Sequence, residues 1–288
     1  MKQRNFLTAL LLTLALSVGA QQPEAYRLYD AQGRPADYQQ MVADLAQQDV
    51  VFVGEMHNCA ITHWLELRLL HALYAANGNA MAVGMEMFEA DNQLIVDEYL
   101  DGVITAERFE AEARLWPNYP TDYAPLVDFV REHGLRLLAT NVPRRYANTV
   151  KNHGIQYLDS LSAAAKQYLP PLPITIQANE QATAAFGMMA MMGRSSNPEW
   201  MAQAQALKDA TMAWNIAQCK QPKVLHYNGA YHTDSGEGII TYLRQYKPGV
   251  RLKTVYAVKQ EDITQLEADY LGRADYYICV PEDMATSY

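Results

Sequence analysis

The sequence predicts an α/β fold with a mainly parallel sheet flanked by helices, and three observations carry this prediction. Short apolar runs recur along the chain, and most are followed by a stretch with helical spacing. The chain has 288 residues, which is enough for one full-sized core. It shows no internal repeat of solenoid or propeller length. Strands that alternate with helices form parallel sheets covered on both faces.

Six apolar runs are expected to be the strands of this sheet. They are residues 49–53, 81–87, 135–139, 224–227, 252–258 and 276–280. Helices are expected at 60–76, 92–100, 106–115 and 122–133. The stretch 158–221 breaks the alternation, because it holds a cluster of prolines, a Met-rich helix near 182–192 and a longer helix near 198–218. We expect this stretch to be a helical insertion over the carboxyl-terminal edge of the sheet.

The start of the chain has the pattern of a secretory signal peptide. A basic beginning is followed by an apolar run over 6–18, and small residues up to Ala20 precede the expected cleavage point. We therefore expect 1–20 to be removed and 21–288 to form a single domain, exported to the periplasm or cell envelope. An uncleaved anchor is the alternative. No cysteine lies near the cleavage point, so there is no lipobox.

Charge and cysteine content exclude several classes of protein. The formal net charge is −9, and no basic stripe offsets it, so we expect no nucleic-acid partner. The three cysteines, Cys59, Cys219 and Cys279, allow at most one internal disulfide and form no zinc-binding Cys cluster. Cys59 lies close to a histidine in the sequence, but a small buried apolar residue is the favoured interpretation.

Acidic and histidine side chains recur where the predicted strands end. Glu55 and His57 follow the first strand, Glu86 lies at the end of the second, and His232 follows the fourth. Ligands bind outside the carboxyl ends of parallel strands, so we expect these four to share one cleft. They could form a divalent-metal site or a cluster for acid–base catalysis.

Each of these residues also has a structural interpretation when it is taken alone. Glu55 could cap the following helix. Glu86 is harder to explain in this way, because a carboxylate in an apolar run is costly unless it is paired or metal-bound. Asp209, in the middle of a predicted helix, is a fifth candidate, with a solvated helix face as the alternative. His63 and His71 are interpreted as surface or core-edge residues.

Several motifs together resemble one known family. They are GEMH (54–57), MEMF (85–88), WPNYPTDYAPLVDF (116–129), LATNVP (138–143), YLPPLP (168–173), KDATM (208–212) and NGAYH (228–232). In this order they resemble the ChaN-like haem-binding lipoproteins, part of a superfamily with erythromycin-esterase-type enzymes and the Tiki metalloproteases. The resemblance covers most of the chain, from about Tyr29 to Tyr256.

The resemblance implies haem binding linked to iron uptake at the cell envelope. It also implies a homodimer that stacks two haems and works with outer-membrane haem uptake machinery. The superfamily's shared positions correspond to Glu55, His57, Glu86 and His232, with Asp209 less directly. In hydrolytic relatives these positions serve metal binding or catalysis. The missing lipobox cysteine departs from the family pattern.

Haem also needs an apolar slot, an axial ligand and cations for its propionates. Residues considered for these roles are Tyr119, Tyr123, Tyr168, Met188, Met189, Met191, Met192 and Arg194. A Met-rich core helix is the alternative for the methionines. The chain has no CxxCH motif for covalent haem attachment and no GxSxG nucleophile elbow. Two functions stay open: haem binding, and metal-dependent hydrolysis by the Glu/His cluster.

Overall fold

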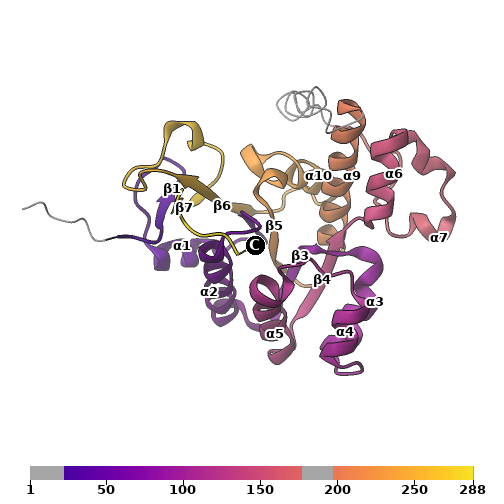
Figure 1. Cartoon of the computed structure of the whole chain (residues 1–288), viewed down its shortest axis with the longest axis horizontal. Helices are drawn as coiled ribbons and strands as arrows, with labels where there is room; N and C mark the ends of the chain where they lie inside the picture. The colour runs from indigo at the N-terminus through magenta and orange to yellow at the C-terminus, as the bar shows by residue number, and fades with distance from the viewer. Residues whose placement is uncertain (1–22, 177–196, 288) are drawn as a thin grey trace, which may run out of the picture.

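A computed structural model of the protein describes residues 23–176 and 197–287. This part is built on one seven-stranded sheet with helices on both faces (Figure 1). The strands are β1 (Arg27–Asp30), β2 (Val50–Glu55), β3 (Met81–Glu89), β4 (Arg136–Asn141), β5 (Lys223–Gly229), β6 (Leu252–Gln260) and β7 (Tyr276–Pro281). Their order is β1-β7-β6-β2-β5-β3-β4. All neighbouring strands are parallel except the antiparallel pair β1 and β7, so the predicted fold class is confirmed.

The helices connect the strands and cover the sheet. They are α1 (Tyr38–Leu45), α2 (Ala60–Asn77), α3 (Gln93–Leu100), α4 (Ala106–Glu112), α5 (Ala124–Glu132), α6 (Arg144–His153), α7 (Ala163–Lys166), α9 (Pro198–Ala217) and α10 (Ile239–Tyr246). Shorter helical turns lie at Gly78–Ala80, Ala90–Asn92, Tyr119–Tyr123, Ile155–Ser160, Ala230–His232, Asp234–Gly236 and Ala268–Tyr270. The prediction missed β1, α1, α6, α7 and α10.

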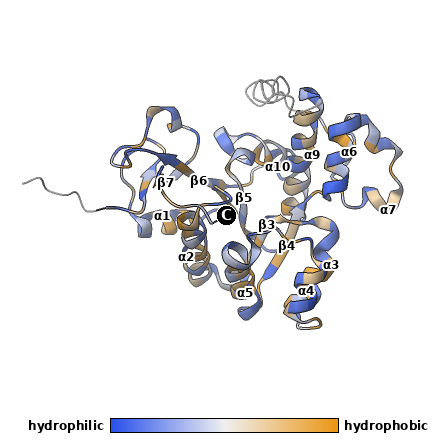
Figure 2. Ribbon diagram, in the orientation of Figure 1, coloured by the Kyte–Doolittle hydropathy of each residue, from blue (hydrophilic) through white to orange (hydrophobic). Residues whose placement is uncertain are grey.

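Successive residues of the central strands point to opposite faces, and each face has its own core. In β2, Val51 and Val53 pack with one set of helices, which includes α1, α2 and α5. Val50 and Phe52 pack with the other set, α6, α9 and α10. Because both faces are covered, the strand is buried along its whole length. Helix α6 is mostly hydrophilic in Figure 2, since only its inner residues reach the core.

The expected insertion at 158–221 is described in two pieces, on either side of residues 177–196. The first piece includes α7, and the second is dominated by α9. Helix α9 packs against α6, α10 and β4, so it covers a face of the sheet as well as contributing to its edge.

The sheet edge at the carboxyl ends of the parallel strands is where the connectivity reverses. From β2 the chain builds β3 and β4 on one side, returns to β5, and then crosses to β6 and β7 on the other side. Crevices for ligands form at such reversal points. The last residues of β2, β3 and β5 all lie at this edge.

Strand β3 is irregular just where it reaches this edge. Met85 pairs with Ala139 and Glu89 pairs with Asn141, so four steps along β3 match two steps along β4. Glu86 lies inside this bulge. A bulge bends a strand and redirects its side chains, which explains how an apolar strand presents a carboxylate at its end.

Among the described residues no helix is long and apolar enough to cross a membrane. All three cysteines lie in the described part and none forms a disulfide. Cys59 is fully buried in the larger core, in agreement with its interpretation as a small apolar residue.

Candidate functional site

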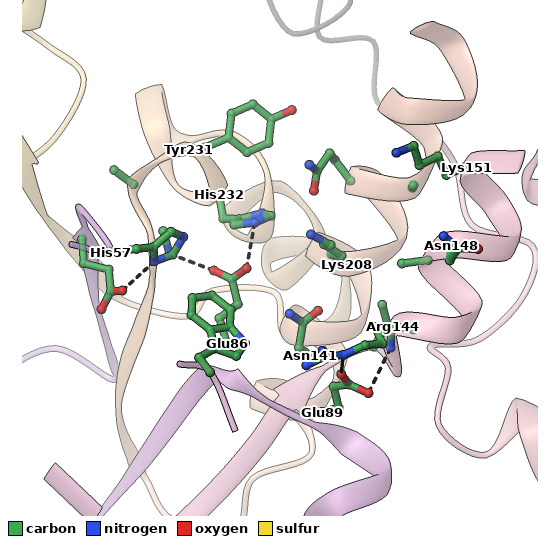
Figure 3. A pocket seen from close by; sticks show the side chains of 18 of the residues that line it. His57, Glu86, Glu89, Asn141, Arg144, Asn148, Lys151, Lys208, Tyr231 and His232 are labelled. Atoms are coloured by element: carbon green, nitrogen blue, oxygen red, sulfur yellow. Dashed lines mark hydrogen bonds and ion pairs between the residues drawn. The ribbon is translucent and has the colours of Figure 1, made fainter. Parts of the chain in front are cut away.

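A pocket of about 900 Å³ opens at the carboxyl-terminal edge of the sheet. Its lining includes Glu55, His57, Glu86 and His232, the four residues expected to share a cleft. Figure 3 shows His57, Glu86 and His232 on one side and Lys208, Asn148 and Lys151 on the other. The pocket therefore joins the ends of β2, β3 and β5 to helices α6 and α9.

The first chemical unit of the pocket is His232 held between two carboxylates. Its Nε2 lies 3.2 Å from Oε1 of Glu86, and its Nδ1 lies 2.5 Å from Oδ1 of Asp209. All three side chains are buried. The backbone N–H of Gly229 donates a hydrogen bond to the other oxygen of Glu86, at 2.8 Å. Asp209 therefore belongs to this unit and does not lie on a solvated helix face.

The charges of this unit follow from its geometry. The two carboxylates raise the pKa of His232 to about 10, although burial opposes this, so the imidazole is protonated at neutral pH. The pKa of Glu86 is held well below its usual range, because His232 and the Gly229 amide outweigh the cost of burial. Burial raises the pKa of Asp209, against the attraction of the shared His232 charge. The unit is thus a buried acid group that can donate a proton.

The second unit is the pair of Glu55 and His57. Nδ1 of His57 lies 2.7 Å from Oε1 of Glu55, and the ring packs edge-on against Trp116. The His57 side chain is 37% exposed, so it faces the open part of the pocket. Gly229 is needed here, because a Cβ at that position would lie 2.8 Å from Nε2 of His57.

Glu55 also belongs to a closed cluster beneath the pocket, which also contains His63 and Glu66 of α2. Nδ1 of His63 lies 2.8 Å from Oε2 of Glu66 and 3.8 Å from Oε2 of Glu55. Tyr123 donates a hydrogen bond of 2.6 Å to Oε1 of Glu55. Burial, with mutual repulsion, raises the pKa of Glu55 to about 8, and burial raises that of Glu66 to about 8.

The sequence interpretation of His63 as a surface or core-edge residue is wrong, since only 5% of the residue is exposed. Glu66 was missed altogether. The available signal was the spacing: His63 and Glu66 lie three residues apart on a helix, so they share the face that carries Leu70 and Leu73 into the core. An acidic residue on an apolar helix face indicates a buried carboxyl group, as Glu86 does in an apolar strand.

The expected metal set does not come together as one group. Within residues 23–176 and 197–287, one group of three or more acidic, His or Cys side chains has ligand atoms that all lie within 4.8 Å of one another. That group is Glu55, His63 and Glu66. His57, Glu86 and His232 are outside it. His57 is paired with Glu55, and His232 is paired with Glu86.

A further histidine, His226, lies inside the sheet between Thr140 and Asn228. Its two ring nitrogens lie 2.9 Å from Thr140 Oγ1 and 3.0 Å from Asn228 Oδ1. Burial lowers its pKa to about 4, so it is neutral. Gly84 leaves room for the ring, because a Cβ there would lie 2.6 Å from it. This network orders the strand ends beneath the site.

The tyrosines considered as haem ligands lie away from the pocket lining. Tyr119 and Tyr123 are buried in the core that includes α5, and burial raises the pKa of both hydroxyls. Tyr168 packs at the edge of the other core and lines a different, smaller cavity. The candidates Met188, Met189, Met191, Met192 and Arg194 lie outside the described residues.

The opposite wall of the pocket is cationic and amide-rich. Arg144 is bound to Glu89, which neutralises it (Figure 3). Lys151 and Lys208 line the pocket, and neither has an ion-pair partner within 4.0 Å in the described part of the chain. Lys151 is therefore available to an anionic group, and Lys208 faces the pocket while its charge also acts on Glu86 and Asp209 at longer range.

Fold and site together define an α/β protein with an acid–histidine pocket at the carboxyl edge of a mainly parallel sheet. The sequence profile described as "Haem-binding uptake, Tiki superfamily, ChaN" matches residues 41–243. The chain therefore belongs to this family, as its motifs predicted.

Solved structures agree on the fold. The structure titled "Cofacial heme binding to ChaN of Campylobacter jejuni" superposes with a TM-score of 0.67 at 19% identity, over 90% of this chain and 98% of that one. A succinoglycan biosynthesis protein superposes with a TM-score of 0.52 at 10% identity, over 89% and 94% of the two chains. These identities support a shared fold and nothing finer.

One curated relative is similar in sequence. Protein RETICULATA-RELATED 5, chloroplastic, of Arabidopsis thaliana is 26% identical over 157 residues, which are 50% of this chain. The match spans about a fifth (21%) of the relative's length.

Proposed function

We propose that this protein binds haem in the pocket at the sheet edge and serves haem or iron uptake in the cell envelope. Membership of the haem-binding uptake family supports the proposal. The observation that carries it is the composition of the pocket, which joins an apolar wall, a cationic rim and a carboxylate-supported histidine.

The walls suit a flat apolar ligand with acidic groups at one side. Leu115, Trp116, Val142 and Met201 supply apolar surface. The pocket volume of about 900 Å³ lies within the range of cofactor sites. Lys151 and Lys208 would pair with the propionates of haem, because neither rim cation has an ion-pair partner within 4.0 Å among the described residues.

His57 is the residue that we expect to contact the iron. Its Nδ1 is held by Glu55, which fixes the ring, and the side chain lines the pocket with Nε2 close to Gly229. Histidines that bind metals commonly donate a hydrogen bond from their other ring N–H to a carboxylate in this way. Bound haem would supply an iron with axial positions for such a ligand.

A hemin titration followed at the Soret band tests this function. The parent should bind hemin, and His57→Ala should weaken binding by more than about tenfold, because it removes an iron ligand. His71→Ala is the matched control, since His71 is an exposed histidine of α2 outside the pocket. A parent without a Soret shift would contradict the proposal, and equal losses in both variants would contradict the role of His57.

The expectations for the segment 186–194 belong to the same proposal. Met188 and Met192 would add apolar surface, and Arg194 would lie near a propionate. Replacing the two methionines with serine should weaken hemin binding through lost apolar contact, at about 25 cal/mol per Å².

Sedimentation with and without hemin tests the expected homodimer. Interaction with outer-membrane uptake machinery is a further part of the proposal.

Hydrolysis is the second candidate function, and the geometry of His232 favours it. A protonated imidazole between Glu86 and Asp209 is a positioned general acid at the pocket. Turnover of activated esters that disappears in His232→Gln would support an enzyme. Hydrolysis at the same rate in both proteins would exclude a role for this unit.

A further inference from the structure

The closed cluster beneath His57 holds more carboxyl groups than cations. Glu55, Glu66 and Asp122 are buried there with one imidazole, that of His63. No lysine or arginine forms an ion pair with these carboxylates in the described part of the chain. Buried carboxylates need a cation, a metal or a proton.

We propose that Glu55, His63 and Glu66 bind a divalent transition-metal ion of the Zn²⁺ class. Each side chain offers a ligand atom, and the three atoms lie within 4.8 Å of one another. All three residues are at least nine-tenths buried. Two carboxylate oxygens and one imidazole nitrogen are a ligand set that zinc and manganese accept, whereas Ca²⁺ and Mg²⁺ favour oxygen alone.

Two oxygens of the cluster lack a hydrogen-bond donor. Oε2 of Glu55 and Oε1 of Glu66 are fully enclosed and accept no hydrogen bond from the described residues. Their partner oxygens are used, by Tyr123 and His57 for Glu55 and by His63 for Glu66. Each carboxyl group thus has one oxygen with a hydrogen-bond donor and one oxygen without.

His63 has acceptors at both of its ring nitrogens, an arrangement that a protonated imidazole satisfies and that a metal at one nitrogen also satisfies. Nδ1 faces Glu66, while Nε2 lies 3.1 Å from the carbonyl oxygen of His57 and 3.4 Å from Oδ2 of Asp122. A neutral imidazole has only one N–H. With a metal at Nδ1, the N–H at Nε2 donates to that carbonyl or to Asp122, the usual outer arrangement of a metal-bound histidine.

The two acceptors that face Nε2 of His63, the carbonyl of His57 and the carboxylate of Asp122, are held by neighbouring side chains. Asn118 donates to Oδ2 of Asp122 at 2.8 Å and to the carbonyl of His57 at 2.9 Å. Ser287 donates to the same Asp122 oxygen at 2.7 Å. The acceptors that would orient His63 are therefore fixed by neighbouring residues.

The metal would act on the pocket through Glu55, which has one oxygen on each side. Oε1 contacts His57, and Oε2 points into the cluster. An ion on Oε2 would hold Glu55 in place and thereby orient His57. This consequence rests on the proposed haem function, whereas the metal site itself does not.

Metal content of the full chain, purified without chelator, tests the site together with zinc titration of protein stripped with EDTA. The parent should hold zinc or manganese in stoichiometric amount, and its melting temperature should rise on zinc addition. Glu66→Gln should lose the metal and the zinc-dependent rise. Glu86→Gln is the matched control, because it removes a buried carboxylate at the same sheet edge but outside the cluster.

Asp122→Asn is a milder change, and it tests the site even if Glu66→Gln fails to fold. It should weaken zinc binding by about tenfold, as loss of a group that orients a metal-bound histidine does. A parent without metal and without a zinc-dependent melting shift would overturn the proposal, leaving a proton shared by Glu55 and Glu66. Loss of metal in Glu86→Gln with retention in Glu66→Gln would also overturn it and place the ion in the pocket.

Discussion

Asp209 and His232 are joined by a hydrogen bond of 2.5 Å between Oδ1 and Nδ1, although they lie 23 residues apart. Asp209 lies on α9, and His232 lies in the turn that follows β5. The bond fixes the helix that covers one face of the sheet to the edge that carries the pocket. His232 therefore connects the core to the site.

Glu86→Gln should destabilise the protein, since the variant leaves His232 with only one of its two carboxylates. Breaking a buried ion pair by removing one partner costs about 3 kcal/mol. Urea unfolding at neutral pH measures the change against the parent. A variant as stable as the parent would show that the ion pair contributes nothing to folding.

The pH dependence of stability should report His232 directly. Its folded pKa of about 10 exceeds the ordinary value of 6.5, so its stabilisation is complete below about pH 6.5 and is lost as the pH rises through 10. The lowered pKa of Glu86 adds stability above about pH 4.5 that is lost in acid. The difference between the parent and Glu86→Gln in unfolding free energy should thus be largest near pH 5 to 6.5. A difference that grows toward pH 10 would contradict this assignment.

Asp209→Asn tests the other side of His232. The amide keeps the shape of the carboxylate and removes its charge, so the pKa of His232 should fall from about 10 toward neutrality. NMR titration of the imidazole measures this directly. Asp234→Asn, outside the pocket lining, is the control and should leave the titration unchanged.

The rim lysines should make hemin binding sensitive to salt. Lys151→Met and Lys208→Met keep the length of the side chain and remove its charge. Each should weaken binding by about threefold to tenfold at low ionic strength, with a smaller loss at high salt. Lys253→Met is the control, since Lys253 lies outside the pocket lining and is paired with Asp44. Unchanged affinity in both rim variants would place the propionates elsewhere.

Processing at the start of the chain gives the last prediction. Mass spectrometry of protein from the envelope fraction should find a mature chain that begins near Gln21. An intact Met1 in a cytosolic fraction would contradict export. This experiment is independent of haem and metal binding.

Residue patterns were enough to predict the sheet and one half of the site. Six strands followed from apolar runs, because strands buried on both faces have no polar alternation to obscure them. Strand β1 was not predicted, since a four-residue antiparallel edge strand carries little pattern. Glu86 and His232 were found because strand ends of a parallel sheet share an edge.

The buried cluster could not be predicted from strand ends, because two of its members lie on a helix. His63 and Glu66 have ordinary helix spacing, and only the packing of α2 against the sheet shows that they point inward. The contacts of Glu55 with both His57 and His63 could not be predicted either. Its two oxygens serve different neighbours, and a sequence gives no orientation of a carboxylate.

Gly229 lies under both chemical units of the pocket. Its N–H holds Glu86, and its Cα, which lacks a side chain, lies beneath the ring of His57. The floor between the two units is therefore a single peptide, and any displacement of that peptide moves an anion and an imidazole together. A ligand that displaces His57 would therefore shift Gly229 and, through its N–H, the carboxylate of Glu86, with no movement of the helices.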